Sequence, residues 1–129
     1  MTLLTDTHAY QWWLAEPERL SPAAGLALGA ADEIVVASVT WYELAWLAVR
    51  GRIRTSGTIE SWLQRISRDV RTIGLTPSIA TAAASLPPSF SSDPADRIIF
   101  ATAREHGWEL VSKDALMRQH ASLIPGVIW

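Results

Sequence analysis

The stretch "DPADRIIFATAREHGWELVSKD", residues 93–114, contains a helix-to-strand unit and three aspartates. Asp93 is a good N-cap, because its carboxylate can accept hydrogen bonds from the free N–H groups of a first helical turn. Pro94 then falls at the first helical position, where its missing N–H costs nothing. The apolar-periodic run ends at Gly107 and "WELVS" follows it. The stretch therefore predicts a helix that ends near Gly107 and a strand over 108–112.

Asp96 has two explanations within this stretch. It falls at the third position of the predicted helix, where the helix dipole favours a negative charge. A helix-start signal therefore accounts for both Asp93 and Asp96 without any function. Alternatively, Asp96 uses the entrance of the helix to present a carboxylate to a binding site. The stretch alone leaves both explanations open.

The composition describes one domain, residues 1–129, with enough apolar residues for a hydrophobic core. The chain has no cysteine, which excludes disulfides and cysteine-based zinc sites. Its net charge of -2 gives no sign of a globally basic nucleic-acid binder, although a local basic patch or a bound cation would be compatible with one. No secretory signal or membrane-spanning segment is evident. We therefore expect a soluble cytoplasmic protein.

The rest of the chain continues the alternation of strands and helices. Short apolar or β-branched runs predict strands, and amphipathic or alanine-rich runs predict helices. The expected strands are 3–5, 33–38, 72–76 and 126–129, and the expected helices are 7–18 (stopped near Pro17), 22–31, 40–51, 58–70, 77–86 and a short one from Asp114. This order predicts an α/β fold with a central, mostly parallel β-sheet flanked by α-helices.

Four acids lie where such a fold collects its ligands, beyond the carboxyl ends of the strands. Asp6 follows the first strand, Glu43 lies just inside the helix after the second, and Asp114 follows "WELVS" by two residues. Together with Asp96 they would gather at one edge of the sheet and repel one another. A hard divalent cation such as Mg²⁺ or Mn²⁺ would remove that repulsion, because it prefers carboxylate and water oxygens.

Each of these acids also has a local explanation. Glu43 lies three residues after Thr40, in the T-x-x-E pattern of a capping box. Asp6 and Asp114 each precede a predicted helix and would serve as N-caps. Helix starts are where caps belong, so the caps neither predict nor exclude a common site. Both interpretations stay open at this point.

Five stretches together resemble the PIN-domain toxins of the VapC type. In chain order they are "LLTDTHAYQWWL", "ASVTWYELAWLAVRGRI", "LTPSIATAAASLP", the opening stretch and the final "PGVIW". The likeness extends over almost the whole chain. "DPADR", with the apolar helix and "LVSKD" after it, is the most specific part, and "DTH" is much weaker alone.

The resemblance implies a PIN-like fold and an endoribonuclease that depends on Mg²⁺ or Mn²⁺. It assigns the metal-binding and catalytic carboxylates to Asp6, Glu43, Asp96 and Asp114. Asp93 belongs to the same pattern and is expected mainly as a cap, with a role at the metal left open. The resemblance also implies an RNA substrate, a cognate VapB-type antitoxin, a homodimer and a larger toxin–antitoxin assembly. The RNA that is cleaved and the number of metal ions are left open.

Arginines and tryptophans are the other candidates for contacts with partners. Arg50, Arg52 and Arg54 form a dense basic run that would track an RNA backbone or form a solvated surface. Arg97 adjoins Asp96 and would either pair with an acid or touch phosphate. Trp12, Trp13 and Trp46 are candidates for an antitoxin contact, with burial in the chain's own core as the alternative.

Two other functions compete with the nuclease. One is a catalytically inactive PIN-like module that only binds RNA or protein, which four intact acids argue against. The other is an aspartate-based phosphoryl-transfer or receiver-like α/β domain using Asp6. That class needs further acids or a lysine near the first strand, and "DTH" lacks the D-x-D pattern.

Overall fold

A computed structural model describes all residues, 1–129. Its centre is a five-stranded sheet in which every neighbouring pair is parallel, with strand order β3-β2-β1-β4-β5. The strands are β1 (Thr2–Thr5), β2 (Glu33–Ala37), β3 (Arg71–Ile73), β4 (Glu109–Val111) and β5 (Val127–Ile128). The predicted α/β fold and its parallel sheet are confirmed.

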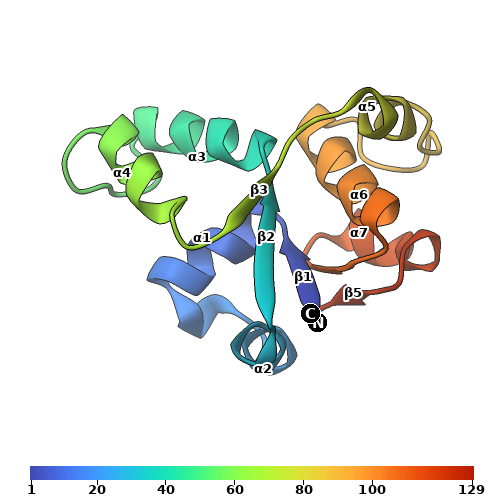
Figure 1. The fold of residues 1–129 in the computed structure, drawn as a ribbon, viewed down its shortest axis with the longest axis horizontal. Helices are drawn as coiled ribbons and strands as arrows, with labels where there is room; N and C mark the ends of the chain where they lie inside the picture. Colours follow the sequence, from blue (N-terminus) through green and yellow to red (C-terminus); the bar gives the residue numbers. More distant parts are fainter.

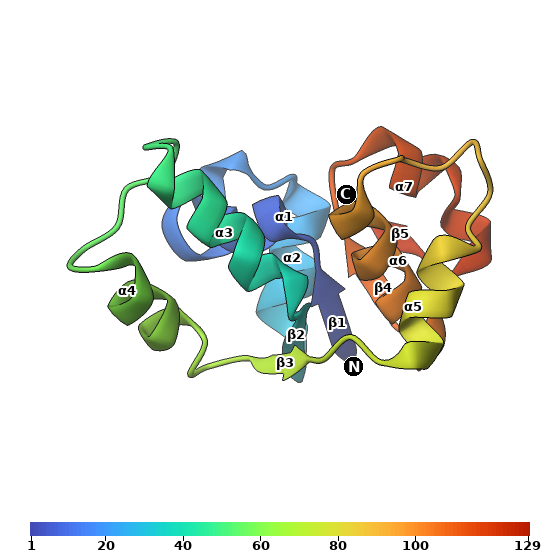
Figure 2. The same cartoon turned by 90° about the horizontal axis from the view of Figure 1, so that it is seen from above.

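Helices cover both faces of the sheet (Figures 1 and 2). One face carries α1 (Thr7–Ala15), α2 (Pro22–Ala30), α3 (Val39–Val49) and α4 (Ile59–Ile66), and the other carries α5 (Pro77–Ala84), α6 (Pro94–His106) and α7 (Ala115–Gln119). Two short 3₁₀ helices, η1 (Pro17–Arg19) and η2 (Ala121–Leu123), were not predicted. No helix is both long and apolar enough to span a bilayer.

The core is built mainly on the face that carries α6. Leu4, Val35 and Leu110 project from three adjacent strands into a cluster with Ile99 and Phe100 of α6, and all five are fully buried. These strand residues are β-branched or leucine, as expected for a parallel sheet covered on both faces. The arrangement fixes α6 across the sheet and so fixes the direction in which its first turn points.

Helix α6 begins and ends where the sequence predicts. The Asp93 carboxylate accepts a hydrogen bond from the backbone N–H of Ala95 at 2.9 Å, and Pro94 occupies the first turn. Gly107 ends the helix with φ 68°, a left-handed conformation that glycine adopts without strain. Asp93 is therefore the cap, and Asp96 lies at the third helical position, as predicted.

The register of the sheet places the strand ends together. Thr5 of β1 pairs with Val36 of β2 on one side and with Val111 of β4 on the other. The residues that follow these three positions therefore lie at the same carboxyl edge. Asp6 and Ser112 are the polar residues among them, and each leaves the sheet directly after its strand.

Candidate functional site

The carboxyl edge of the sheet holds a cavity of about 450 Å³ lined mostly by polar side chains. Its residues come from the ends of β1 and β4 and from the helices α1, α3 and α6. Five of the nine lining residues are acids: Asp6, Glu43, Asp93, Asp96 and Asp114. The other four are Thr7, His8, Trp12 and Lys113. The structure thus brings together all four acids of the predicted site, with Asp93 beside them. We call it the acid cavity.

Asp6 is buried directly after β1, and hydrogen bonds fix both oxygens of its carboxylate. It is only 8% exposed, and its Oδ1 accepts from the backbone N–H of Ala9 at 2.8 Å as the N-cap of α1. Its Oδ2 accepts from the hydroxyl of Ser112 at 2.5 Å. Burial raises the pKa of Asp6, against the opposing effect of the Ser112 and Ala9 hydrogen bonds. The predicted cap role of Asp6 is correct, and it coexists with a place in the acid cavity.

Glu43 is held in the cavity by a contact that the sequence did not predict. Helix α3 begins at Val39, so Thr40 lies inside it and the expected Thr40–Glu43 capping box is wrong. Instead, the hydroxyl of Thr7 donates to the Glu43 carboxylate and also lies 3.2 Å from the hydroxyl of Thr40. Burial raises the pKa of Glu43, and the nearby Asp93 and Asp6 raise it further.

Asp96 and Asp114 complete the acidic lining. Asp96 accepts a hydrogen bond from the hydroxyl of Ser91 at 3.2 Å and is half-buried. Burial raises its pKa to about 7, with Asp93, Asp114 and Glu43 adding electrostatic repulsion. Asp114 caps α7, as its local explanation predicts, by accepting from the backbone N–H of Met117 at 2.9 Å. Four carboxylates thus perturb one another across one cavity.

Ser112 and Thr7 are the functional residues that sequence reasoning missed. Ser112 is fully buried; its hydroxyl donates to Asp6 and accepts from the backbone N–H of Asp114 at 3.0 Å. It therefore ties two of the acids together, and Thr7 holds a third, Glu43. The only sequence signal for these two residues is their place near the strand ends: Thr7 lies in "DTH" after β1, and Ser112 lies in "LVSKD" directly after β4.

The raised pKa of Asp96 predicts how the stability of the metal-free chain depends on pH. Its folded pKa of about 7 exceeds the ordinary value of 3.8. Between these values the folded chain keeps a proton that the unfolded chain has lost, so the free energy of unfolding falls as pH rises through this window. In EDTA at about pH 8, Asp96→Asn should therefore exceed the parent chain by about 1–2 kcal/mol after allowance for solvent screening.

Urea denaturation of both chains over about pH 4 to pH 8 measures this difference. At the acid end the two chains should differ little in stability, because the folded chain keeps Asp96 protonated and the unfolded chain, close to the ordinary pKa of 3.8, has lost only part of that proton. A stability gap that is the same at every pH would contradict the assignment.

Arg97 does not pair with an acid, and its expected contact with an RNA phosphate stays a prediction. Its guanidinium donates to four backbone carbonyls between residues 83 and 91, at 2.7–3.5 Å, and it forms no ion pair with an acid. Those donors hold the loop between α5 and α6 against the start of α6. The observed role of Arg97 is therefore structural, and the side chain is not directed at the acid cavity.

Two arginines of the basic run lie against the ring of Trp46 on α3, and the third does not. The guanidinium of Arg50 stacks over Trp46 at 3.7 Å from the ring centroid, and that of Arg52 lies 5.4 Å from it. Arg54 is exposed and contacts no aromatic ring or acid. Only the first two therefore lie beside an aromatic side chain of α3.

The structure thus combines a parallel sheet with acids that come from the ends of β1 and β4, from α3 and from the start of α6, and that gather at the carboxyl edge. The model of the PIN domain family matches residues 3–123, nearly the whole chain. The chain belongs to the PIN-domain family.

The comparisons also indicate the branch of that family. The chain is 52% identical over 128 residues to ribonuclease VapC22 of Mycobacterium tuberculosis, covering 99% of this chain and 98% of that protein. It is similar in structure to a toxin–antitoxin complex from Klebsiella pneumoniae, with a TM-score of 0.71, 23% identity, and 98% and 96% of the two chains covered. It is also similar to VapC20 of M. tuberculosis, a sarcin–ricin loop cleaving toxin, with a TM-score of 0.67, 16% identity, and 95% and 97% covered. The predicted VapC resemblance is confirmed.

Proposed function

We propose that this chain is the toxin of a type II toxin–antitoxin pair and cleaves RNA as a metal-dependent endoribonuclease. The observation that carries the proposal is the acid cavity, where Asp6, Glu43, Asp96 and Asp114 converge from four separate elements. The 52% identical relative, named a ribonuclease, supports RNA as the substrate.

The donor set of the acid cavity suits Mg²⁺ or Mn²⁺. As they stand, no three acids or histidines are close enough together to coordinate one ion directly. This fits a magnesium-type site, which keeps several waters and uses only one or two carboxylates directly. The raised pKa values of Asp6, Glu43 and Asp96 also fit, because burial, with added repulsion between the acids, disfavours their charged forms and a bound cation would favour them. When bound, such an ion lowers the pKa of a water and neutralises charge on a phosphate.

Neighbouring residues of the chain orient the carboxylates of the acid cavity. Ser112 and the N–H of Ala9 fix both oxygens of Asp6, and Thr7 fixes Glu43. Lys113, the single lysine, is exposed and lines the cavity, where its charge would attract the RNA backbone. The acids would repel RNA without a cation, so these residues act on the substrate only in the metal-loaded protein.

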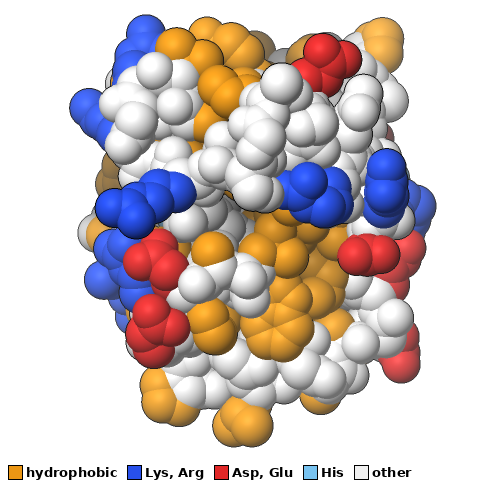
Figure 3. All heavy atoms as spheres, turned by 90° about the vertical axis from the view of Figure 1, so that its left-hand side faces the viewer, with side chains coloured by type: hydrophobic (Ala, Val, Ile, Leu, Met, Phe, Trp, Pro, Cys, Tyr) orange, Lys and Arg blue, Asp and Glu red, His pale blue; other side chains and the backbone are white.

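A VapB-type antitoxin is the partner in this proposal. The related solved structures include toxin–antitoxin complexes, and these support such a partner. Hydrophobic side chains gather beside charged ones on the side of the molecule that carries α1 and α4 (Figure 3). Trp13 and the exposed Leu14 at the end of α1 line a shallow cavity on the chain's surface. The homodimer and a larger assembly stay predictions from the resemblance.

The chemistry of the cut ends tests this function. Total bacterial RNA incubated with the purified chain and Mg²⁺ should be cut internally, leaving 5′-phosphate and 3′-hydroxyl ends, because attack by an activated water displaces the 3′ oxygen. Sequencing of ends with and without phosphate-specific adaptor ligation measures the outcome. Ends that carry a 2′,3′-cyclic phosphate would instead indicate attack by the ribose 2′-hydroxyl and would refute the hydrolytic mechanism.

A further inference from the structure

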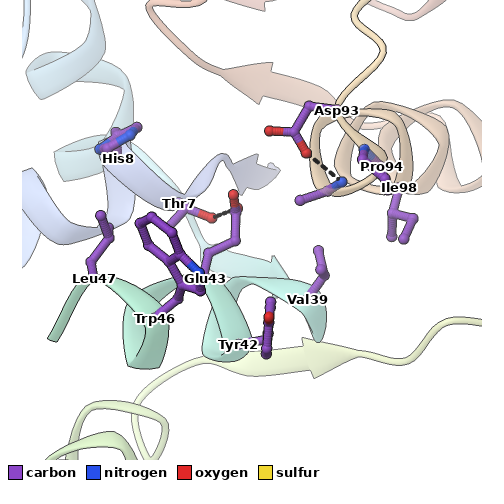
Figure 4. Close-up of a pocket in the computed structure, with 11 residues that line it drawn as sticks. Thr7, His8, Val39, Tyr42, Glu43, Trp46, Leu47, Asp93, Pro94 and Ile98 are labelled. Atoms are coloured by element: carbon purple, nitrogen blue, oxygen red, sulfur yellow. Dashed lines mark hydrogen bonds between the residues drawn. The ribbon is translucent and has the colours of Figure 1, made fainter. Parts of the chain in front are cut away.

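A second cavity adjoins the acid cavity and has a different character. It measures about 360 Å³ and shares four residues with the acid cavity: Thr7, His8, Glu43 and Asp93. Its remaining lining is mostly hydrophobic or aromatic, and comes from α3 (Val39, Tyr42, Trp46, Leu47) and from the first turns of α6 (Pro94, Ala95, Ile98). We call it the aromatic pocket. Figure 4 shows the Glu43 carboxylate of α3 and the Asp93 carboxylate at the start of α6 in the space between the two helices, with Trp46 beside Glu43 on α3.

The aromatic side chains of this pocket are not used to build the fold. Trp12 is buried, and Trp13 and Trp62 pack against core clusters, as the burial alternative predicted, but Trp46 belongs to no core cluster. Tyr42 is 69% exposed, which is unusual for so large a side chain. Exposed aromatic residues that line a pocket beside a polar site are typical of ligand contacts.

Positive charge lies on the rim of the pocket. Arg50 stacks on Trp46 and Arg52 lies close to the same ring, at the 3.7 and 5.4 Å given above. Proteins hold single-stranded nucleic acids by stacking bases on aromatic side chains and binding the backbone phosphates with arginines. The aromatic pocket has aromatic side chains with two arginines beside one of them, and it adjoins the acid cavity, where the phosphate would be cut. The pocket volume lies at the lower end of the range of small-ligand sites, about 300–1,000 Å³, so it has room for one flat ring system.

We propose that the aromatic pocket binds one unpaired nucleobase of the RNA, next to the phosphate that is cut in the acid cavity, by stacking against Trp46. The inference rests on the proposed ribonuclease function and adds a base-binding subsite beside the acid cavity. A base inside a duplex is stacked and paired on both sides and cannot enter such a pocket. Arg50 and Arg52 then contact the neighbouring backbone phosphates, whereas Arg54, which does not contact Trp46, does not.

The test combines a substitution in the protein with a deletion in the RNA. Trp46→Leu keeps apolar volume and removes the aromatic face, and Trp46→Phe keeps a ring. For a short single-stranded RNA cut by the parent chain, Trp46→Leu should lower kcat/KM about tenfold, since a base–aromatic stack is worth about 1–3 kcal/mol. Trp46→Phe should retain most of the activity. Trp108→Leu, just before β4 at the end opposite the acid cavity, is the matched control: it removes a ring that packs against the main core cluster, so it should lower the stability of the fold and leave kcat/KM unchanged.

Abasic RNAs then locate the contact. A set of the same RNA with one base removed at each position near the cut is given to both chains. At one position only, loss of the base should slow the parent chain about tenfold and leave Trp46→Leu unaffected, because the two changes remove the same contact. A Trp46→Leu defect that is equal at every abasic position would overturn the proposal, as would a weakened homodimer with no change in RNA cleavage.

Binding separates this proposal from the ribonuclease itself. Fluorescence anisotropy of the same labelled RNA, with Mg²⁺, is measured on Asp96→Asn with and without Trp46→Leu. Weaker binding of the double variant, by about tenfold, supports the pocket even if the parent chain cuts no RNA. Equal binding by the two chains overturns the pocket and leaves the nuclease assignment untouched.

Discussion

Asp96→Asn is expected to lower RNA cleavage by about a hundredfold to a thousandfold, the usual cost of losing one key electrostatic contact in an active site. Asparagine has nearly the same volume and can still accept from Ser91, so the helix start is kept while the charge is lost. Asp6→Asn should behave in the same way, because asparagine is also a good N-cap for α1. Initial rates on one defined RNA measure the effect.

Two matched variants make the result specific. Asp69→Asn removes an exposed acid that lies outside the acid cavity and should leave the rate unchanged. Asp93→Asn keeps the cap of α6 and should lose less than about tenfold if Asp93 is chiefly a cap. When the chains are expressed in bacteria without antitoxin, the parent should arrest growth, and Asp6→Asn and Asp96→Asn should relieve the arrest. Equal toxicity of all three would reject the catalytic assignment.

Removing divalent cations is expected to abolish cleavage altogether. With no cation the acid cavity presents several carboxylates to a phosphate, so the substrate is repelled and no water is activated. Mg²⁺ or Mn²⁺ added back in excess of EDTA should restore the rate. Cation binding should also raise the melting temperature of the parent chain, because a ligand that binds only the folded state stabilises it.

The melting experiment has its own control. Asp96→Asn already lacks part of the repulsion, so its melting temperature should respond less to Mn²⁺ than that of the parent chain. Cleavage that continues unchanged in EDTA, with no added cation, would exclude this mechanism.

Most of the fold could be predicted from the sequence because its signals are local. Caps, β-branched runs and helical periodicity placed every strand and α-helix within a few residues, from the strand before Asp6 to the helix after Asp114. Alternation of the two then implied a parallel sheet, and with it the edge at which ligands gather. The four acids were found by that rule and the VapC resemblance.

The supporting contacts of the site could not be predicted, because they join residues far apart in the sequence. Ser112 reaches Asp6 across 106 residues and Thr7 reaches Glu43 across 36. The Thr40–Glu43 capping box is wrong because α3 begins two residues earlier than that pattern needs: the cap position is Ser38 and not Thr40. Likewise, nothing in the sequence indicates that Arg97 faces loop carbonyls rather than an acid.

The central claim is that a divalent cation binds among Asp6, Glu43, Asp96 and Asp114. Anomalous diffraction from crystals of the parent chain soaked in Mn²⁺ tests it most directly. The account predicts an anomalous peak in the acid cavity, within reach of these carboxylates, and its loss in crystals of Asp96→Asn. An empty acid cavity at saturating Mn²⁺, or a peak elsewhere that persists in Asp96→Asn, would contradict it.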